Sequence, residues 1–243
     1  MSDEDSATKR EQAQRVREMF AAIATRYDLL NHLLSGNVDQ RWRRLVVKKV
    51  AASLPAKEAR VLDVACGTGD LSLALTEGTK ARVVGLDFCR PMLDIADVKA
   101  SAHHLLIPFV EGDALRLPFR DRSFDAVSIA FGLRNLASFE GGLSELFRIL
   151  RPGGTVAVLE FSTPRIPILR TLFRVYFTNL LPLLGGLISG SKSAYEYLPD
   201  SVSRFPDQAA LVALLQKAGF SEVTFQNLTG GIAALHIGKR PQA

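Results

Sequence analysis

The stretch Val61-Leu62-Asp63-Val64-Ala65-Cys66-Gly67-Thr68-Gly69-Asp70 decides the fold class. It begins as a short apolar run, which is typical of a buried strand. It ends in a glycine-containing turn, and the residues after the turn have the apolar spacing of a helix. Glycines at such a turn adopt backbone dihedrals closed to other residues and let the backbone approach a ligand. The stretch therefore predicts a strand, a ligand-binding turn and a helix.

The rest of the chain repeats this alternation of strand and helix. Alternating apolar strands and helices predict a parallel sheet covered by helices on both faces. Near the C-terminus a short turn containing Gly230-Gly231 predicts an antiparallel hairpin. Together they predict a doubly wound, seven-stranded, mostly parallel α/β sheet, the Rossmann-like layout of class I methyltransferases. The strands are expected at 61–65, 82–87, 107–110, 124–130, 155–161, 222–226 and 232–237.

The length of 243 residues suits a single domain. Residues 1–10 are expected to be a flexible tail, and 11–243 one domain. Within it, residues 11–55 carry apolar positions every three or four residues, which predicts an N-terminal helical lid. Residues 164–204 follow the fifth strand and predict an apolar helical insert that caps the substrate. Arginines, a proline and glycines interrupt its apolar run, which argues against a membrane span.

The composition excludes several classes of protein. Two cysteines are too few for a disulfide framework, and the polar N-terminus lacks the apolar core of a secretory signal, so the expected location is the cytoplasm. The formal net charge is only +5, and most of the basic residues are scattered. The fourth strand is followed by Ala130-Phe131-Gly132-Leu133 instead of the [DN]-P-P-[YF] run of base N-methyltransferases. We therefore expect no nucleic-acid partner, and we predict no metal site.

The turn and the second strand indicate which nucleotide binds. Asp87 comes twenty residues after Gly67, at the end of the second strand, where a carboxylate accepts the ribose hydroxyls. The third glycine of the dinucleotide fingerprint is absent, because Gly69 is followed by Asp70-Leu71-Ser72. Asp70 would repel a pyrophosphate but suits a ligand with a sulfonium and an ammonium. The pattern therefore favours S-adenosylmethionine over a dinucleotide.

Two further positions fit the adenine. Asp113 follows the third strand, where its carboxylate can accept the exocyclic amine, and Met92 offers a polarizable apolar contact. The alternatives are a helix N-cap for Asp113 and an ordinary core position for Met92. A nucleophilic role for Cys66 is disfavoured because no histidine is near it in sequence. The predicted cofactor-binding residues are Asp63, Gly67, Thr68, Gly69, Asp87, Met92, Asp113, Ala114 and Ala130.

Three segments resemble a known family. Tyr27-Asp28-Leu29-Leu30-Asn31-His32-Leu33-Leu34-Ser35, followed by Trp42, resembles the N-terminal signature of the quinone-biosynthesis C-methyltransferases. These enzymes methylate demethylmenaquinone and the related ubiquinone precursor. The run from Arg148 to Ser162 is similar to their second signature, and Phe131-Gly132-Leu133-Arg134-Asn135 to the run after their fourth strand. The departures are Leu30 for Met, Asp39 for His, Ile149 for Val and Arg151 for Lys. Asp39 removes an imidazole, so a base at that position does not carry over.

The resemblance implies C-methylation of a prenylated quinol, with demethylmenaquinol to menaquinol as the first expectation. The alternatives are 2-methoxy-6-polyprenyl-1,4-benzoquinol, another small aromatic acceptor, and, from a different class, a non-catalytic nucleoside-binding module. A ring carbon becomes nucleophilic when the adjacent hydroxyl loses its proton, so the reduced quinol is the expected acceptor. Arg134 can stabilise the phenolate but cannot act as a base. The candidate proton acceptors are Asp28, His32 and His236, with structural roles as the alternative for both histidines.

The substrate is expected to meet the lid and the insert. The predicted substrate residues are Tyr27, Asn31, Asn135 and Phe173. Because a prenylated quinol resides in the bilayer, the insert is expected to touch the inner face of the cell membrane peripherally. The alternatives for the insert are a cover for the sheet and a contact in a homodimer.

Overall fold

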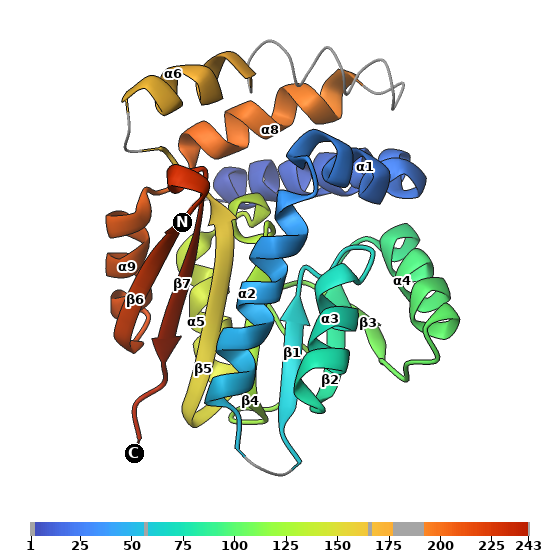
Figure 1. Cartoon of the computed structure of the whole chain (residues 1–243), viewed down its shortest axis with the longest axis vertical. Coiled ribbons are helices and arrows are strands. Elements are labelled where there is room, and N and C mark those ends of the chain that lie inside the picture. Colours follow the sequence, from blue (N-terminus) through green and yellow to red (C-terminus); the bar gives the residue numbers. More distant parts are fainter. Residues whose placement is uncertain (1–2, 56–57, 165–166, 177–191, 243) are drawn as a thin grey trace.

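The computed structural model describes residues 3–55, 58–164, 167–176 and 192–242. Their centre is a seven-stranded sheet in the order β3-β2-β1-β4-β5-β7-β6 (Figure 1). The first five strands are parallel, and β7 runs antiparallel to both of its neighbours, which confirms the expected fold class. The strands are β1 (Arg60–Val64), β2 (Arg82–Asp87), β3 (Phe109–Glu111), β4 (Phe124–Ala130), β5 (Leu150–Phe161), β6 (Ser221–Leu228) and β7 (Ala233–Lys239).

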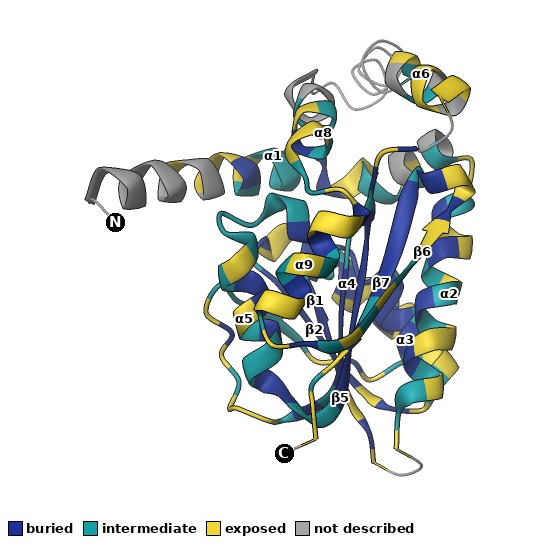
Figure 2. Ribbon diagram, turned by 90° about the vertical axis from the view of Figure 1, so that its left-hand side faces the viewer, coloured by how far each residue is buried: buried dark blue, intermediate teal, exposed yellow. Residues whose placement is uncertain are grey.

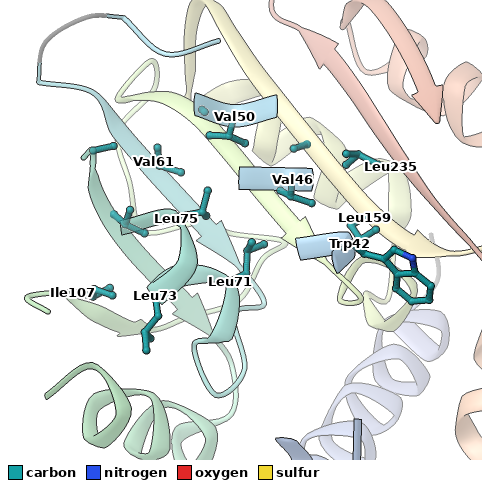
Figure 3. Close-up of a cluster of buried hydrophobic side chains, with 14 of the residues drawn as sticks. Trp42, Val46, Val50, Val61, Leu71, Leu73, Leu75, Ile107, Leu159 and Leu235 are labelled. Atoms are coloured by element: carbon teal, nitrogen blue, oxygen red, sulfur yellow. The ribbon is translucent and has the colours of Figure 1, made fainter. Parts of the chain in front are cut away.

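Helices cover both faces of the sheet, as Figure 2 shows. On one face, α2 (Val38–Ser53), α3 (Asp70–Thr79) and α4 (Arg90–Ala102) pack on β1, β2 and β5. Figure 3 shows this core, in which Trp42, Val46 and Val50 of α2 lie against side chains of β1, β5 and β7. On the other face lie α5 (Phe139–Ile149) and α9 (Gln208–Lys217). Burial on both faces explains why the central strands are almost wholly apolar.

Two local signals in the sequence set the ends of helices. Ser138 caps α5, because its hydroxyl accepts a hydrogen bond from the Gly141 N–H at 3.0 Å. Asp207 caps α9 in the same way, accepting from the Ala210 N–H at 2.8 Å. Gly219, with φ of +104°, follows the end of α9 and adopts the left-handed region that favours glycine.

Helix α1 (Asp3–Ser35) crosses the carboxyl ends of the parallel strands, and α8 (Lys192–Arg204) lies over it beside α6 (Pro167–Val175) (Figure 1). These helices lie in the two segments for which a lid and a cap are predicted. Ile23 of α1 is buried in a cluster with Phe173 and Leu198 from the two cap helices. Within the described part of the chain, no helix is long and apolar enough to cross a bilayer.

The structure differs from several sequence-based expectations. Helix α1 begins at Asp3, where a tail over 1–10 was expected; Asp3, Glu4 and Asp5 form its first turn, where acidic residues are favoured by the helix dipole. β5 begins at Leu150 and not at the expected residue 155, so Gly153 (φ +77°) lies in an irregular part of the strand. β3 covers 109–111 and not 107–110. Much of the expected insert, 165–166 and 177–191, lies outside the described residues.

Candidate active site

A cavity of about 670 Å³ opens at the carboxyl ends of β1, β2 and β4. We call it the cofactor cavity. It brings together six of the residues predicted to bind the cofactor: Gly67, Asp87, Met92, Asp113, Ala114 and Ala130. Its other lining residues are Gln14, Arg17, Phe20, Tyr27, Ala65, Leu86, Phe88, Glu111, Gly112, Leu115, Phe131, Gly132, Asn135, Leu136 and Ala137.

Asp87 joins the end of β2 to the glycine turn. Its Oδ2 accepts the Gly67 N–H at 2.8 Å, and its Oδ1 accepts the Cys89 N–H at 2.9 Å. Burial raises the pKa of this carboxyl, and the backbone N–H groups oppose that shift. Each carboxylate oxygen has a second lone pair, so the group can still accept hydrogen bonds from two vicinal hydroxyls.

The end of the cavity that was predicted to take the adenine lies between β3 and α4. Met92 is 2% exposed, so it is both a core residue and part of the cavity lining. Asp113 does not cap a helix, because it starts a turn in which the Arg116 N–H donates to its carbonyl at 3.0 Å. Its Oδ1 accepts the Leu115 N–H at 2.8 Å, which holds the carboxylate at the cavity wall.

The two glycines of the turn have different roles. Gly67 (φ +55°) lines the cofactor cavity, and a Cβ placed there would approach only Tyr27, at 4.0 Å. Gly69 (φ +84°) lines none of the three cavities, and its predicted contact with the cofactor stays a prediction. A Cβ on Gly69 would lie 3.0 Å from the Ala96 Cβ and 3.2 Å from Leu73. Gly69 therefore serves the packing of α3 against α4.

A second cavity of about 30 Å³ lies beside the turn and is lined by Asp63 and Thr68, among others. The Asp63 carboxylate accepts hydrogen bonds from the hydroxyls of Ser72 and Ser128, each at 2.7 Å. Asp63 is 1% exposed, and this burial raises its pKa to about 6. The side chain of Asp63 is therefore chiefly engaged in joining β1 to α3 and β4.

Asp70 also lines the small cavity, close to two cations. It forms ion pairs with Lys99 and, at 3.7 Å, with Arg43, and its Oδ2 lies 3.5 Å from His32 Nε2. Both cations are shared with other carboxylates. That Asp70 suits a cationic ligand therefore stays a prediction. Arg43 and Lys99 come from α2 and α4, which no local pattern in the sequence reveals.

Three candidate proton acceptors lie outside all three described cavities. Asp28 accepts hydrogen bonds from the Thr68 hydroxyl and from Lys99 Nζ, the latter at 2.8 Å. His32 Nδ1 lies 2.9 Å from Asp39 Oδ2. The structure thus places Asp28 and His32 where α1 meets the glycine turn and α2, and their catalytic role stays a prediction. His236 is buried in β7, where Nε2 contacts the Gln208 carbonyl at 3.0 Å and burial lowers its pKa.

A third cavity, of about 80 Å³, adjoins the cofactor cavity, and we call it the acceptor cavity. Phe20, Tyr27 and Phe131 line both. Arg134 lies in its wall and donates from Nη1 to Glu160 Oε1 at 2.8 Å. The buried Nε of Arg134 has no hydrogen-bond partner among the described residues. The other residues of this wall are Met19, Ile23, Ser35, Asp39, Trp42, Arg43, Phe161, Tyr197 and Leu198.

The four predicted substrate residues are distributed unevenly. Tyr27 lines all three cavities, and Asn135 lines the cofactor cavity. Phe173 packs in the cluster around Ile23 and lines none of them, so its contact with the substrate stays a prediction. The side chain of Asn31 lies outside the described part of the chain.

Sequence reasoning missed several wall residues. Phe131 lines all three cavities and has a φ of +57°, which is rare for a residue with a side chain and is concentrated at functional sites. Its place directly after the fourth strand is the only local signal. Arg17, Arg43 and Tyr197 reach the walls from α1, α2 and α8. Among the residues that the structure covers, no three His, Cys, Asp or Glu side chains gather as metal ligands.

Comparisons with known proteins support the fold and give the family. Similar solved structures show the fold: the [4+2]-cyclase SpnF (TM-score 0.70, 18% identity, covering 95% of this chain and 97% of that one) and a Thermotoga maritima S-adenosylmethionine-dependent methyltransferase (TM-score 0.63, 20% identity, covering 92% and 98%).

The sequence relatives are closer. A demethylmenaquinone methyltransferase of Thermus thermophilus is 54% identical, covering 92% of this chain and 100% of the relative. A Deinococcus radiodurans enzyme of the same name is 47% identical, covering 96% and 95%. A ubiquinone/menaquinone biosynthesis C-methyltransferase of a Geobacter species is 44% identical, covering 95% and 98%. The ubiE/COQ5 methyltransferase family model matches residues 8–240, and the chain belongs to this family of methyltransferases.

Proposed function

We propose that this chain transfers a methyl group from S-adenosylmethionine to a ring carbon of a prenylated quinol, with demethylmenaquinol as the acceptor. The observation that carries the proposal is the place of Arg134 in the wall of a cavity that adjoins the cofactor cavity, together with its buried Nε, which has no hydrogen-bond partner among the described residues. A buried donor without a partner is costly, so it favours a ligand with an oxygen at that point. The names of the relatives support the same acceptor class.

The residues present fit S-adenosylmethionine. The volume of about 670 Å³ falls in the range of small-molecule pockets. Asp87 would accept the ribose hydroxyls, and Met92 would lie against the adenine. The glycine turn and the small cavity beside it would take the amino-acid end. The bound cofactor supplies an electrophilic methyl group on a sulfonium.

The chain's own residues would orient the acceptor and stabilise its charge. Arg134 stays protonated in a protein and presents its N–H groups to the oxygen that becomes a phenolate. Glu160 fixes the guanidinium plane through the 2.8 Å hydrogen bond. Helices α1 and α8 cover the carboxyl ends of the strands and thereby limit the access of water (Figure 1). Positioning alone can supply much of the rate enhancement of a displacement.

The two cavities meet at Tyr27 and Phe131, which line both. The acceptor cavity, at about 80 Å³, is smaller than pockets that enclose whole ligands. We infer that the quinol ring also occupies the adjoining end of the cofactor cavity. This position would place a ring carbon next to the sulfonium methyl.

The test is methyl transfer from labelled S-adenosylmethionine to chemically reduced demethylmenaquinone in detergent, with the oxidised quinone as control. Transfer to the quinol alone supports both the acceptor and the phenolate chemistry. A parallel reaction with 2-methoxy-6-polyprenyl-1,4-benzoquinol tests the second candidate, which the Geobacter relative's name favours. Binding of the cofactor without transfer to either quinol would overturn the proposal.

We also propose that α6 touches the membrane surface peripherally, on the inner face of the cell membrane. Ile168 and Val175 of α6 are 75% and 53% exposed, and Arg170 is exposed near them. Replacing Ile168 and Val175 together with Glu should abolish sedimentation with anionic liposomes. The matched control is Val98→Glu, because Val98 is 69% exposed on α4, away from the cap. Equal sedimentation of both variants would contradict the idea. The homodimer stays a prediction that light scattering would check.

A further inference from the structure

Tyr197 brings the cap into the wall of the acceptor cavity. It lies in α8, and its ring lines that cavity together with Leu198. Its hydroxyl donates a hydrogen bond to Asn135 Oδ1 at 3.2 Å. Asn135 in turn lines the cofactor cavity, and its Nδ2 donates to the Phe131 carbonyl at 3.4 Å. One hydrogen-bonded chain therefore links the cap, the acceptor cavity and the cofactor cavity.

The charges around Tyr197 favour a neutral phenol. Burial raises its pKa above the usual value, and Arg134 of the neighbouring turn partly opposes the shift. The other charged groups that act on it are Glu160 in β5 and Asp200 and Arg204 on its own helix. Tyr197 therefore keeps its proton at the pH at which the acceptor hydroxyl must ionise.

We propose that Tyr197 is a positioning residue for the acceptor, whose hydroxyl binds the same ring oxygen that Arg134 stabilises. This inference rests on the proposed function. While the Tyr197 proton points to Asn135, the Oη lone pairs face the cavity and accept the hydrogen of the neutral quinol hydroxyl. When that hydroxyl ionises, rotation about the Tyr197 C–O bond turns the same proton toward the phenolate.

In this arrangement the acceptor receives hydrogen bonds from two parts of the molecule, the sheet domain and the cap. Arg134 belongs to the short turn after β4 (Leu133–Asn135), whereas Tyr197 comes from α8. Both donors would thus reach the phenolate only when the cap lies over the sheet edge. Tyr197 forms and breaks no covalent bond, so its contribution is orientation and stabilisation of charge.

The test is the substitution Tyr197→Phe, which removes one oxygen and keeps the ring. We expect kcat/KM for the reduced quinol to fall about ten- to hundredfold, since a hydrogen bond to a charged group is worth one to two factors of ten. We expect the acidic limb of the pH profile of kcat to move to higher pH by about one unit, because the phenolate is less stabilised. Binding of S-adenosylhomocysteine, followed by calorimetry, should stay unchanged.

The matched control is Tyr176→Phe. Tyr176 is a half-buried tyrosine at the end of α6 whose pKa burial also raises, and it lines none of the described cavities. It packs in the same cluster as Leu198. A purely structural effect of losing a cap hydroxyl would appear in both variants.

The possible outcomes are distinct. An unchanged pH profile in Tyr197→Phe, or an effect equal to that of Tyr176→Phe, would overturn the role of Tyr197. Partial unfolding would not imitate the expected result, because a smaller active fraction lowers the rate at every pH without moving the limb. If the wild-type protein methylates no quinol, the proposed function fails first, and the two failures can be told apart.

Discussion

Nη1 of Arg134 donates a hydrogen bond to Oε1 of Glu160 at 2.8 Å, and the two side chains are only 6% and 1% exposed. The Arg134 backbone N–H also donates to Glu160 Oε2, at 3.3 Å. Burial raises the pKa of Glu160, and Arg134 opposes that shift most strongly. Arg134 therefore has two roles: it balances the buried charge of Glu160, and it lies in the wall of the acceptor cavity.

The first prediction separates these two roles of Arg134. Glu160→Gln should lower the free energy of unfolding by about 3–5 kcal/mol, because it leaves a buried cation without its partner. The double variant Arg134→Met, Glu160→Met should be more stable than Glu160→Gln, because it leaves no unpaired buried charge. It should nevertheless lack methyl transfer, because it has no guanidinium to stabilise the phenolate. Urea unfolding and the transfer assay measure the two effects. Retained activity in the double variant would remove Arg134 from the chemistry.

Asp63 predicts a pH dependence of stability. Its pKa is about 6 in the folded protein and near its ordinary value of 3.8 in the unfolded chain. Between these values the folded state binds more protons, so Asp63 stabilises the fold below about pH 4 and loses that contribution as the pH rises through 6. The shift of about two units corresponds to roughly 3 kcal/mol.

The measurement is urea unfolding of wild type and Asp63→Asn from pH 4 to pH 7. Asparagine does not titrate, so the stability of the variant relative to wild type should increase by about 2–3 kcal/mol across this range. A difference that stays constant with pH would show that Asp63 titrates normally.

Asp87→Asn should weaken binding of S-adenosylhomocysteine about ten- to hundredfold, since the change removes a charged acceptor for the ribose hydroxyls. In the wild-type protein the backbone N–H groups of Gly67 and Cys89 both donate to the Asp87 carboxylate. In the variant, the side-chain NH₂ group would lie against one of these N–H groups, and two donors repel each other. Calorimetry gives the affinity. Asp94→Asn is the control, because Asp94 is exposed on α4 and pairs only with Arg90 in the described contacts. Equal losses in both variants would contradict the assignment.

Asp28→Asn tests whether Asp28 acts as a base or only holds α1 against the glycine turn and α4. The carboxylate binds Thr68 and Lys99 and is partly exposed. Such a pair is worth at most about 1 kcal/mol, so cofactor affinity should fall by no more than about fivefold. We expect kcat to stay within a few-fold of wild type. A loss of kcat beyond a thousandfold would restore the role of a base.

Gly67→Ala and Gly69→Ala form a matched pair on one turn. Both glycines have positive φ, so both substitutions strain the backbone. The Gly67→Ala variant should chiefly lose affinity for S-adenosylhomocysteine, because its methyl group enters the cofactor cavity. The Gly69→Ala variant should chiefly lose stability, by about 1–3 kcal/mol, because its methyl group meets Ala96 and Leu73. Thermal melts and calorimetry distinguish the two, and identical behaviour would contradict their separate roles.

The sequence by itself determined the sheet, the place of the cofactor turn and the family. Strand and helix periodicities are local, so apolar runs such as 61–65 and 124–130 identified the buried strands without any knowledge of their neighbours. The positions of Gly67 and Asp87 followed from the rule that ligands bind at the carboxyl ends of parallel strands. Three signature-like segments then indicated the reaction.

Only the tertiary structure decided which charged residues are available for chemistry. Asp28, His32 and Asp70 look like free acids and bases in the sequence. In the structure Lys99 pairs with both Asp28 and Asp70, and the His32 ring lies 2.9 Å from Asp39 on another helix. Likewise Tyr197 lies 62 residues from Asn135 along the chain and still donates to it. Partners of this kind are set by how helices pack over the sheet edge, and no local pattern encodes that packing.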